Sequence, residues 1–171
     1  MFTTRMRGSG FKETLRNAPA GYELTCESPE GEFIMGEGET RLRHVFIAAG
    51  IGITPYRSIL RYAVDRNEPL NVLMLYFNRS SADIVFRHEF EGIARQMPTF
   101  SFVNVLTEPE ESWEGEQGKL SPELLRKLLP APDGISFWVS GPPPMVGACR
   151  ELLEQLGVKD QSIRTDRFMG Y

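Results

Sequence analysis

From His44 onward, short apolar runs alternate with segments whose apolar residues repeat at helical spacing. Strands that are apolar nearly throughout are typical of a parallel sheet covered by helices on both faces. The pattern therefore predicts an α/β fold with a doubly wound, five-stranded parallel sheet in the order 3-2-1-4-5. The expected strands are 44–50 (HVFIAAG), 71–78 (NVLMLYFN), 100–107 (FSFVNVLT), 135–141 (ISFWVSG) and 163–168 (IRTDRF).

The segments between these strands predict helices. Phe86, Phe90, Ile93 and Met97 recur at helical spacing, which gives their helix a core-facing side. Ser121, followed by proline, is a typical N-cap. The expected helices are 55–67, 81–97, 121–129 and 143–157.

The first 40 residues differ in character, and we expect two parts, an appendage at 1–40 and the main domain at 41–171. Tyr22 to Ser28 alternates as a half-buried strand does, and 28–33 (SPEGEF) carries the residues of a turn.

Composition narrows the class of function. A formal net charge of −4 in 171 residues gives no basic face for nucleic acid, which favours small-molecule chemistry. The apolar runs are too short to span a bilayer and no apolar leader is evident, so we expect a cytoplasmic protein without a membrane span. Cys26, Cys149, His44 and His88 show no metal-ligand spacing, and we interpret them as structural or exposed.

The sharpest local motif is AAGIGITP, at the end of the first expected strand. Bare glycines let the backbone turn and approach a phosphate, Thr54 can cap the following helix, and Pro55 suits its first position. The motif predicts an anion site at a helix N-terminus, although a purely structural turn remains an alternative. It is not the G-x-G-x-x-G motif, because Pro55 replaces the third glycine. The candidate residues are Gly50, Ile51, Gly52, Thr54 and Pro55.

A second motif, WVSGPPPMV at 138–146, also joins a strand to a helix. Ligands of open α/β sheets lie beyond the carboxyl ends of strands, near the point where strand order reverses. If the fourth strand packs beside the first, Ser140 and Gly141 face the same crevice as Gly50 and Gly52.

Together the two motifs and the alternation resemble the pyridine-nucleotide domain of the ferredoxin–NADP reductase family of flavoproteins. AAGIGITP resembles that family's GGxGxTP, and SGPPPMV resembles its CGPxxM; the resemblance covers about Arg43 to Tyr171. It implies that Gly50, Gly52, Thr54 and Pro55 hold the pyrophosphate of NAD(P)H. It also implies that a turn at Gly141, Pro142 and Met145 lies on the nicotinamide side.

Ser140 departs from the family pattern, which usually has cysteine there beside the reacting carbon. The resemblance implies that this serine positions the nicotinamide; a helix-entry cap is the alternative. Asn78 and Arg79 stand where the family reads the adenosine ribose, and Arg79 suits a 2′-phosphate. Since Arg79 can equally be a solvated side chain, the choice between NAD and NADP stays open. Phe168 or Tyr171 would guard the flavin stacking space, or simply pack the C-terminus.

In this family an antiparallel barrel with an Arg-x-Tyr-Ser/Thr motif precedes the nucleotide domain and grips FAD, and this sequence contains no such motif. Residues 7–15 (RGSGFKETL) resemble the barrel's short helix, whose start, here Gly8 and Ser9, contacts the flavin pyrophosphate. The segment at 28–33 resembles its last turn. We therefore expect only a remnant of the barrel, and FAD in a full-length protein rather than in this chain alone.

These expectations favour an NAD(P)H-dependent flavoprotein oxidoreductase module that passes hydride to a flavin and on to an unidentified electron acceptor. As this chain alone, it would be inactive. The alternative is a nucleotide-binding module without turnover. A phosphate-transferring enzyme is disfavoured, because no G-x-x-x-x-G-K-[ST] motif occurs.

Overall fold

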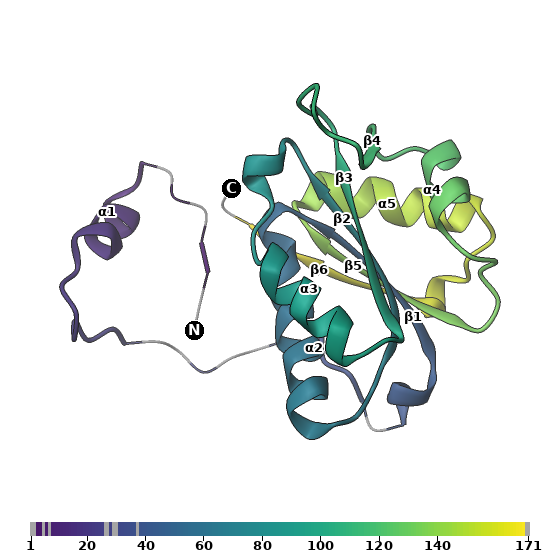
Figure 1. Cartoon of the computed structure of the whole chain (residues 1–171), viewed down its shortest axis with the longest axis horizontal. Helices are drawn as coiled ribbons and strands as arrows, with labels where there is room; N and C mark the ends of the chain where they lie inside the picture. The colour runs from purple at the N-terminus through teal and green to yellow at the C-terminus, as the bar shows by residue number, and fades with distance from the viewer. Residues whose placement is uncertain are drawn as a thin grey trace. The chain divides into compact units, whose positions relative to one another are not determined.

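A computed structural model describes residues 3–4, 6, 8–25, 28, 31–36 and 38–169 of the chain (Figure 1). The chain divides into two compact units, Met1–Glu32 and Phe33–Tyr171. The first unit contains helix α1 (Gly10–Asn17), and the Ser9 hydroxyl accepts a hydrogen bond from the Lys12 N–H at 3.3 Å. The short helix expected near residue 9 is thus confirmed.

The strand expected at Tyr22 to Ser28 is wrong for Tyr22–Thr25, which form no strand. A strand needs a neighbour for its N–H and C=O groups, and none pairs with these described residues. Cys26 and Glu27 lie outside the described part of the chain.

The second unit is built on a parallel sheet in the order β4-β3-β2-β1-β5-β6. The five expected strands have the expected relative order, but the predicted count is wrong, because β4 adds a sixth strand at the β3 edge. It pairs only with Val105 and Leu106, and two polar residues leave no periodic signal in a sequence. The strands are β1 (Arg43–Ala49), β2 (Asn71–Asn78), β3 (Phe100–Leu106), β4 (Glu116–Gln117), β5 (Ile135–Gly141) and β6 (Ile163–Arg167).

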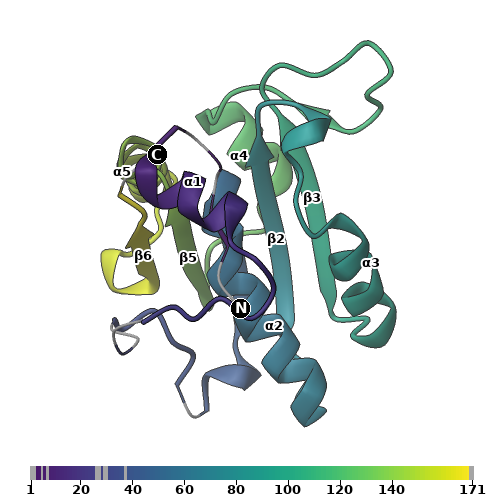
Figure 2. The same ribbon diagram turned by 90° about the vertical axis from the view of Figure 1, so that its left-hand side faces the viewer.

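Helices cover both faces of the sheet (Figures 1 and 2). Helices α2 (Thr54–Arg66) and α3 (Arg87–Gln96) pack on one face, and α4 (Pro122–Leu128) and α5 (Pro143–Gln155) pack on the other. The expected cap at Ser121 is confirmed, since its hydroxyl accepts from the Leu124 N–H at 3.2 Å. No helix in the described ranges combines the length and apolar character that a membrane crossing requires.

Helix α3 begins six residues later than expected. The 3-10 turn η3 (Ser81–Asp83) is closed by a reciprocal pair, in which the Ser80 hydroxyl and N–H both bind the Asp83 carboxylate. Phe86 then takes a left-handed conformation, with φ of 60°, so the helix starts only at Arg87. The remaining 3-10 turns are η1 (Glu39–Arg41), η2 (Gly50–Ile53) and η4 (Asp160–Ser162).

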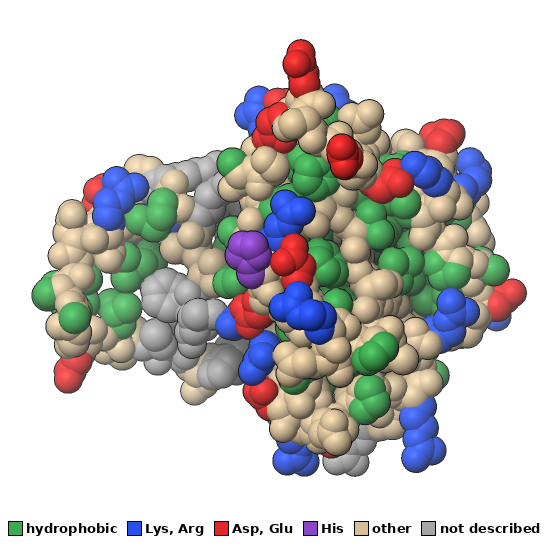
Figure 3. Space-filling view, in the orientation of Figure 1, with side chains coloured by type: hydrophobic (Ala, Val, Ile, Leu, Met, Phe, Trp, Pro, Cys, Tyr) green, Lys and Arg blue, Asp and Glu red, His purple; other side chains and the backbone are tan. Residues whose placement is uncertain are grey.

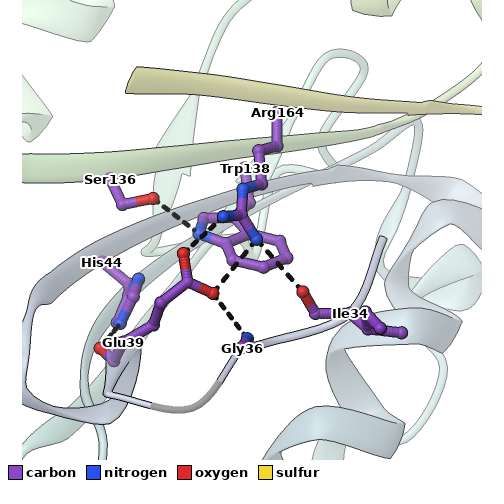
Figure 4. A network of polar contacts seen from close by, with 7 residues as sticks. All are labelled: Ile34, Gly36, Glu39, His44, Ser136, Trp138 and Arg164. Atoms are coloured by element: carbon purple, nitrogen blue, oxygen red, sulfur yellow. Dashed lines mark hydrogen bonds and ion pairs between the residues drawn. The ribbon is translucent and has the colours of Figure 1, made fainter. Parts of the chain in front are cut away.

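A polar network holds the segment before β1 against the sheet (Figure 4). The Arg164 guanidinium lies 4.5 Å from the centre of the Trp138 ring, forms an ion pair with Glu39 and donates to the Ile34 carbonyl at 3.1 Å. The Gly36 N–H donates to the same Glu39 carboxylate at 2.6 Å. These contacts anchor this segment within the second unit, on the face of β5 and β6 that also carries α2.

His44 and Cys149 are both buried, which supports their interpretation as structural residues. The His44 Nε2 lies 2.9 Å from the Glu39 carbonyl oxygen, so this nitrogen carries the proton and donates. Burial lowers the pKa of His44 and raises the pKa of the Cys149 thiol to about 12, so both are neutral at pH 7. His88 is exposed, as the alternative interpretation allowed.

Candidate nucleotide-binding site

The first glycine of AAGIGITP makes the turn that ends β1. Gly50 has a φ of +52°, which a residue with a Cβ rarely adopts, and the Tyr76 hydroxyl donates to its carbonyl at 3.1 Å. The 3-10 turn η2 then runs directly into α2. The strand-to-helix turn is therefore short and fixed at its first residue.

The second glycine brings the two motifs together. A Cβ on Gly52 would lie 2.5 Å from the Ser140 carbonyl carbon and 2.7 Å from the Gly141 Cα, closer than real atoms approach. Strands β1 and β5 pair with Ala48 opposite Ser140, which puts both motifs at one edge of the sheet. The expectation that the fourth strand packs beside the first, with Ser140 close to Gly52, is confirmed.

Thr54 does not cap the helix as expected. The N-cap position belongs to Ile53, whose backbone is already helical, and Thr54 is the first residue of α2. Its hydroxyl donates instead to the Ile51 carbonyl at 3.0 Å, which closes the 3-10 turn. Pro55 is the second helical residue, where its missing N–H costs nothing. The positive end of the α2 dipole is thus directed at the strand edge.

Ser140 is the second-last residue of β5 and is fully buried. The interpretation of Ser140 as a helix-entry cap is wrong, because Pro142 occupies the N-cap of α5 and the Ser140 hydroxyl has no hydrogen-bond partner. Asp166 lies opposite it on β6, and burial raises the pKa of that carboxyl group. A buried hydroxyl without a partner is costly, and a ligand group that donates or accepts would satisfy it.

The turn after Ser140 is equally constrained. Gly141 has a φ of +156°, and a Cβ there would lie 2.8 Å from the Met145 Cε and 3.2 Å from the Ala49 Cβ. The Phe168 N–H donates to the Gly141 carbonyl at 3.0 Å, which brings half-buried Phe168 to the same turn as Pro142. Tyr171 lies outside the described residues.

Asn78 and Arg79 lie at the end of β2 and have contrasting surroundings. Asn78 is buried, and neither its side-chain oxygen nor its side-chain nitrogen has a hydrogen-bond partner. The Arg79 side chain is 72% exposed, and its Nε donates to the Glu108 carboxylate at 2.7 Å. Sequence reasoning missed Glu108 and the neighbouring Glu110, because both follow the next strand. The available signal was that parallel strands end at a common edge.

Gly8 and Ser9 belong to the first unit, where Ser9 is the N-cap of α1. The Ser9 hydroxyl accepts the Lys12 N–H, so the start of this helix still has backbone donors to offer an anion.

The largest cavity, of about 1330 Å³, is a groove beside β3 and contains none of the predicted site residues. Asn104, Trp113 and the pair Ser81 and Glu110 are among its lining residues. Positive and negative side chains are interspersed over the face that Figure 3 shows. We place the candidate site at the strand ends instead, because both glycine motifs and the unpartnered polar atoms converge there.

Comparison with known proteins gives consistent matches. Residues 46–151 match the sequence model of a family described as the oxidoreductase NAD-binding domain. The Na(+)-translocating NADH-quinone reductase of Klebsiella pneumoniae subsp. pneumoniae contains a polypeptide that is 33% identical over 156 residues, which is 88% of this chain and 38% of that polypeptide. NADH-cytochrome b5 reductase 1 of Emericella nidulans is 37% identical over 152 residues, which is 84% of this chain and 48% of that protein.

Among solved structures, the CS-b5R domains of human Ncb5or in the NAD+ form superpose with a TM-score of 0.79 at 29% identity. This match covers 94% of the chain and 46% of the human protein. The chain therefore spans less than half the length of these relatives.

Proposed function

We propose, because this chain belongs to the oxidoreductase NAD-binding domain family, that it binds NAD(P)H and presents it for hydride transfer to a flavin. Membership also confirms the family resemblance drawn from the two glycine motifs. The observation that carries the proposal is the contact of Gly52 with Ser140 and Gly141, which makes one crevice from both motifs.

In the proposed site, the turn of Gly50, Ile51 and Gly52 and the N-terminus of α2 hold the pyrophosphate. Backbone N–H groups at a helix start bind anions, and the helix dipole adds to the attraction. Thr54 and Pro55 support the turn, since the Thr54 hydroxyl closes it onto Ile51.

Ser140 is proposed to orient the nicotinamide through its buried, unpartnered hydroxyl. Gly141, Pro142 and Met145 form the wall beside it, and Phe168 guards the space in which a flavin would stack. The cofactors supply the hydride chemistry, so these residues act by orientation and by exclusion of water. At the other end of the dinucleotide, Asn78 and Arg79 are proposed to meet the adenosine ribose.

We propose that residues 1–40 are the end of a flavin-binding barrel with a linker, and that 41–171 form the nucleotide domain. Gly8 and Ser9 would contact the flavin pyrophosphate in a full-length protein. The 171-residue chain alone would retain little FAD, and a flavin-binding partner or domain would complete it. The electron acceptor remains to be identified, and a cytoplasmic location stays a prediction.

A second candidate function is nucleotide binding without turnover. It is favoured by the length of the chain, which is less than half that of the relatives it matches. Calorimetric titration with NADH and NADPH tests the binding that both candidates share. NADH oxidation in the presence of a flavin-binding partner then separates them.

A further inference from the structure

Two loops meet where the adenosine end of the dinucleotide would lie. The loop after β2 begins at Asn78, and the loop after β3 begins at Thr107. The Thr107 N–H donates to the Asn78 carbonyl at 3.0 Å, and the Glu108 N–H donates to the Arg79 carbonyl at 2.9 Å. These backbone bonds fix the side chains of the β3 loop beside those of the β2 loop.

Carboxylates of the chain already occupy the donors of the β2 loop. Glu108 accepts from Arg79 Nε at 2.7 Å. Glu110 accepts from the Ser81 hydroxyl at 3.0 Å and from the Ser81 N–H at 3.2 Å. Asp83 similarly accepts the Ser80 hydroxyl and N–H. The groups that would bind a 2′-phosphate are therefore engaged before any ligand arrives.

The local charge also opposes a phosphate. Three carboxylates, those of Asp83, Glu108 and Glu110, surround the single guanidinium of Arg79. Hydrogen bonds from its own N–H and from Ser81 lower the pKa of Glu110, so it is ionised at neutral pH. A 2′-phosphate brings roughly two further negative charges. A ribose diol instead donates hydrogen bonds, which carboxylates accept.

We propose that Glu108, by holding Arg79, is a specificity-determining residue that makes the site select NADH over NADPH. This inference rests on the proposed function. Buried Asn78, with both amide atoms unpartnered, marks the same strand end as a place for a ligand. The phosphate of NADPH would have to displace Glu108 from Arg79 and would meet Asp83 and Glu110. Repulsion of the wrong ligand is a usual means of specificity.

The test is calorimetric titration of the whole chain with NADH and with NADPH, for the wild type and for Glu108→Gln. We expect the wild type to bind NADH at least about tenfold more tightly than NADPH. Glu108→Gln should strengthen NADPH binding about fivefold, a size that suits an exposed ion pair. It should change NADH affinity less than about twofold, because a carboxamide still accepts from the ribose.

Glu111→Gln is the matched control, since it removes the same charge three residues farther along the loop. Combining Glu108→Gln with Arg79→Gln should abolish the gain in NADPH affinity. The ratio of the two affinities should also narrow at high salt, because screening weakens the repulsion. A purely structural role of the Arg79–Glu108 pair would change stability but not this ratio.

Equal wild-type affinity for the two nucleotides, or an unchanged ratio in Glu108→Gln, overturns the inference while the proposed function stands. Failure of the wild-type chain to bind either nucleotide overturns both.

Discussion

Gly52 lies directly against the main chain of Ser140, so close that a Cβ at residue 52 would collide with the Ser140 carbonyl group. Strand β1 and strand β5 thereby end in one continuous surface, formed by the turn of one and the last residues of the other. The glycine is required by this close approach, since its φ lies outside the left-handed range.

The first prediction concerns this contact. Gly52→Ala should weaken NADH binding by at least about tenfold, because the new Cβ pushes the two motifs apart. The measurement is calorimetry on protein that circular dichroism shows to be folded. Gly147→Ala is the control, since a Cβ there meets nothing within 4 Å, and it should bind as the wild type does. Equal affinity in a folded Gly52→Ala variant would remove the site from this crevice.

The second prediction concerns Ser140, whose hydroxyl is buried without a partner. Ser140→Ala should leave the melting temperature unchanged or raise it, because it removes an unsatisfied polar group. The same change should slow hydride transfer in the assembled flavoprotein by about tenfold or more if the hydroxyl orients the nicotinamide. Stopped-flow kinetics and thermal unfolding measure the two effects. A clear loss of stability with unchanged kinetics would show that Ser140 is only structural.

The third prediction follows from the lowered pKa of His44, caused mainly by burial. Because the unfolded state binds the proton more readily, stability is complete above the unfolded pKa of about 6.5 and is lost as pH falls through it. The free energy of unfolding should fall there by at most about 1.4 kcal/mol per pH unit. Urea unfolding of the wild type and His44→Gln between pH 5 and pH 7, roughly the range in which histidine titrates, measures this. A steeper pH dependence in His44→Gln would contradict the assignment.

The fourth prediction concerns Arg164, which stacks on Trp138 and binds Glu39 and the Ile34 carbonyl. Arg164→Ala should lower the free energy of unfolding by about 1 to 3 kcal/mol, since it loses a cation–π contact and charge-assisted hydrogen bonds. Arg61→Ala, which breaks an exposed pair with Asp65, should cost about 0.5 kcal/mol or less. Denaturant unfolding compares the two. Equal losses would mean that the network around Trp138 contributes no more than an ordinary surface pair.

Much of this fold was predictable because its central strands are buried on both faces. Phe46, Leu75 and Val139 belong to apolar runs that only a covered parallel sheet explains. Strand β4 was not predictable, since Glu116 and Gln117 are polar and gain their conformation from pairing with β3. The late start of α3 depends on the left-handed backbone of Phe86, which a bulky residue adopts only under tertiary constraint.

The candidate site divides in the same way. The glycines at positions 50 and 52 reveal their position by residue type, because the backbone geometry there admits little else. The partners of Arg79 and Ser81 were missed, since Glu108 and Glu110 each lie 29 residues farther along the chain and approach only when β3 pairs with β2.

The central claim is that this chain holds the nucleotide while another part of the flavoprotein holds the flavin. The most direct test mixes the 171-residue chain with the separately produced flavin-binding barrel of a family member and follows flavin absorbance after NADH is added. The account predicts that the chain alone is colourless but binds NADH, and that flavin reduction requires both components. Reduction of a stoichiometric flavin by the chain alone, or a barrel that NADH reduces equally fast without the chain, would contradict it.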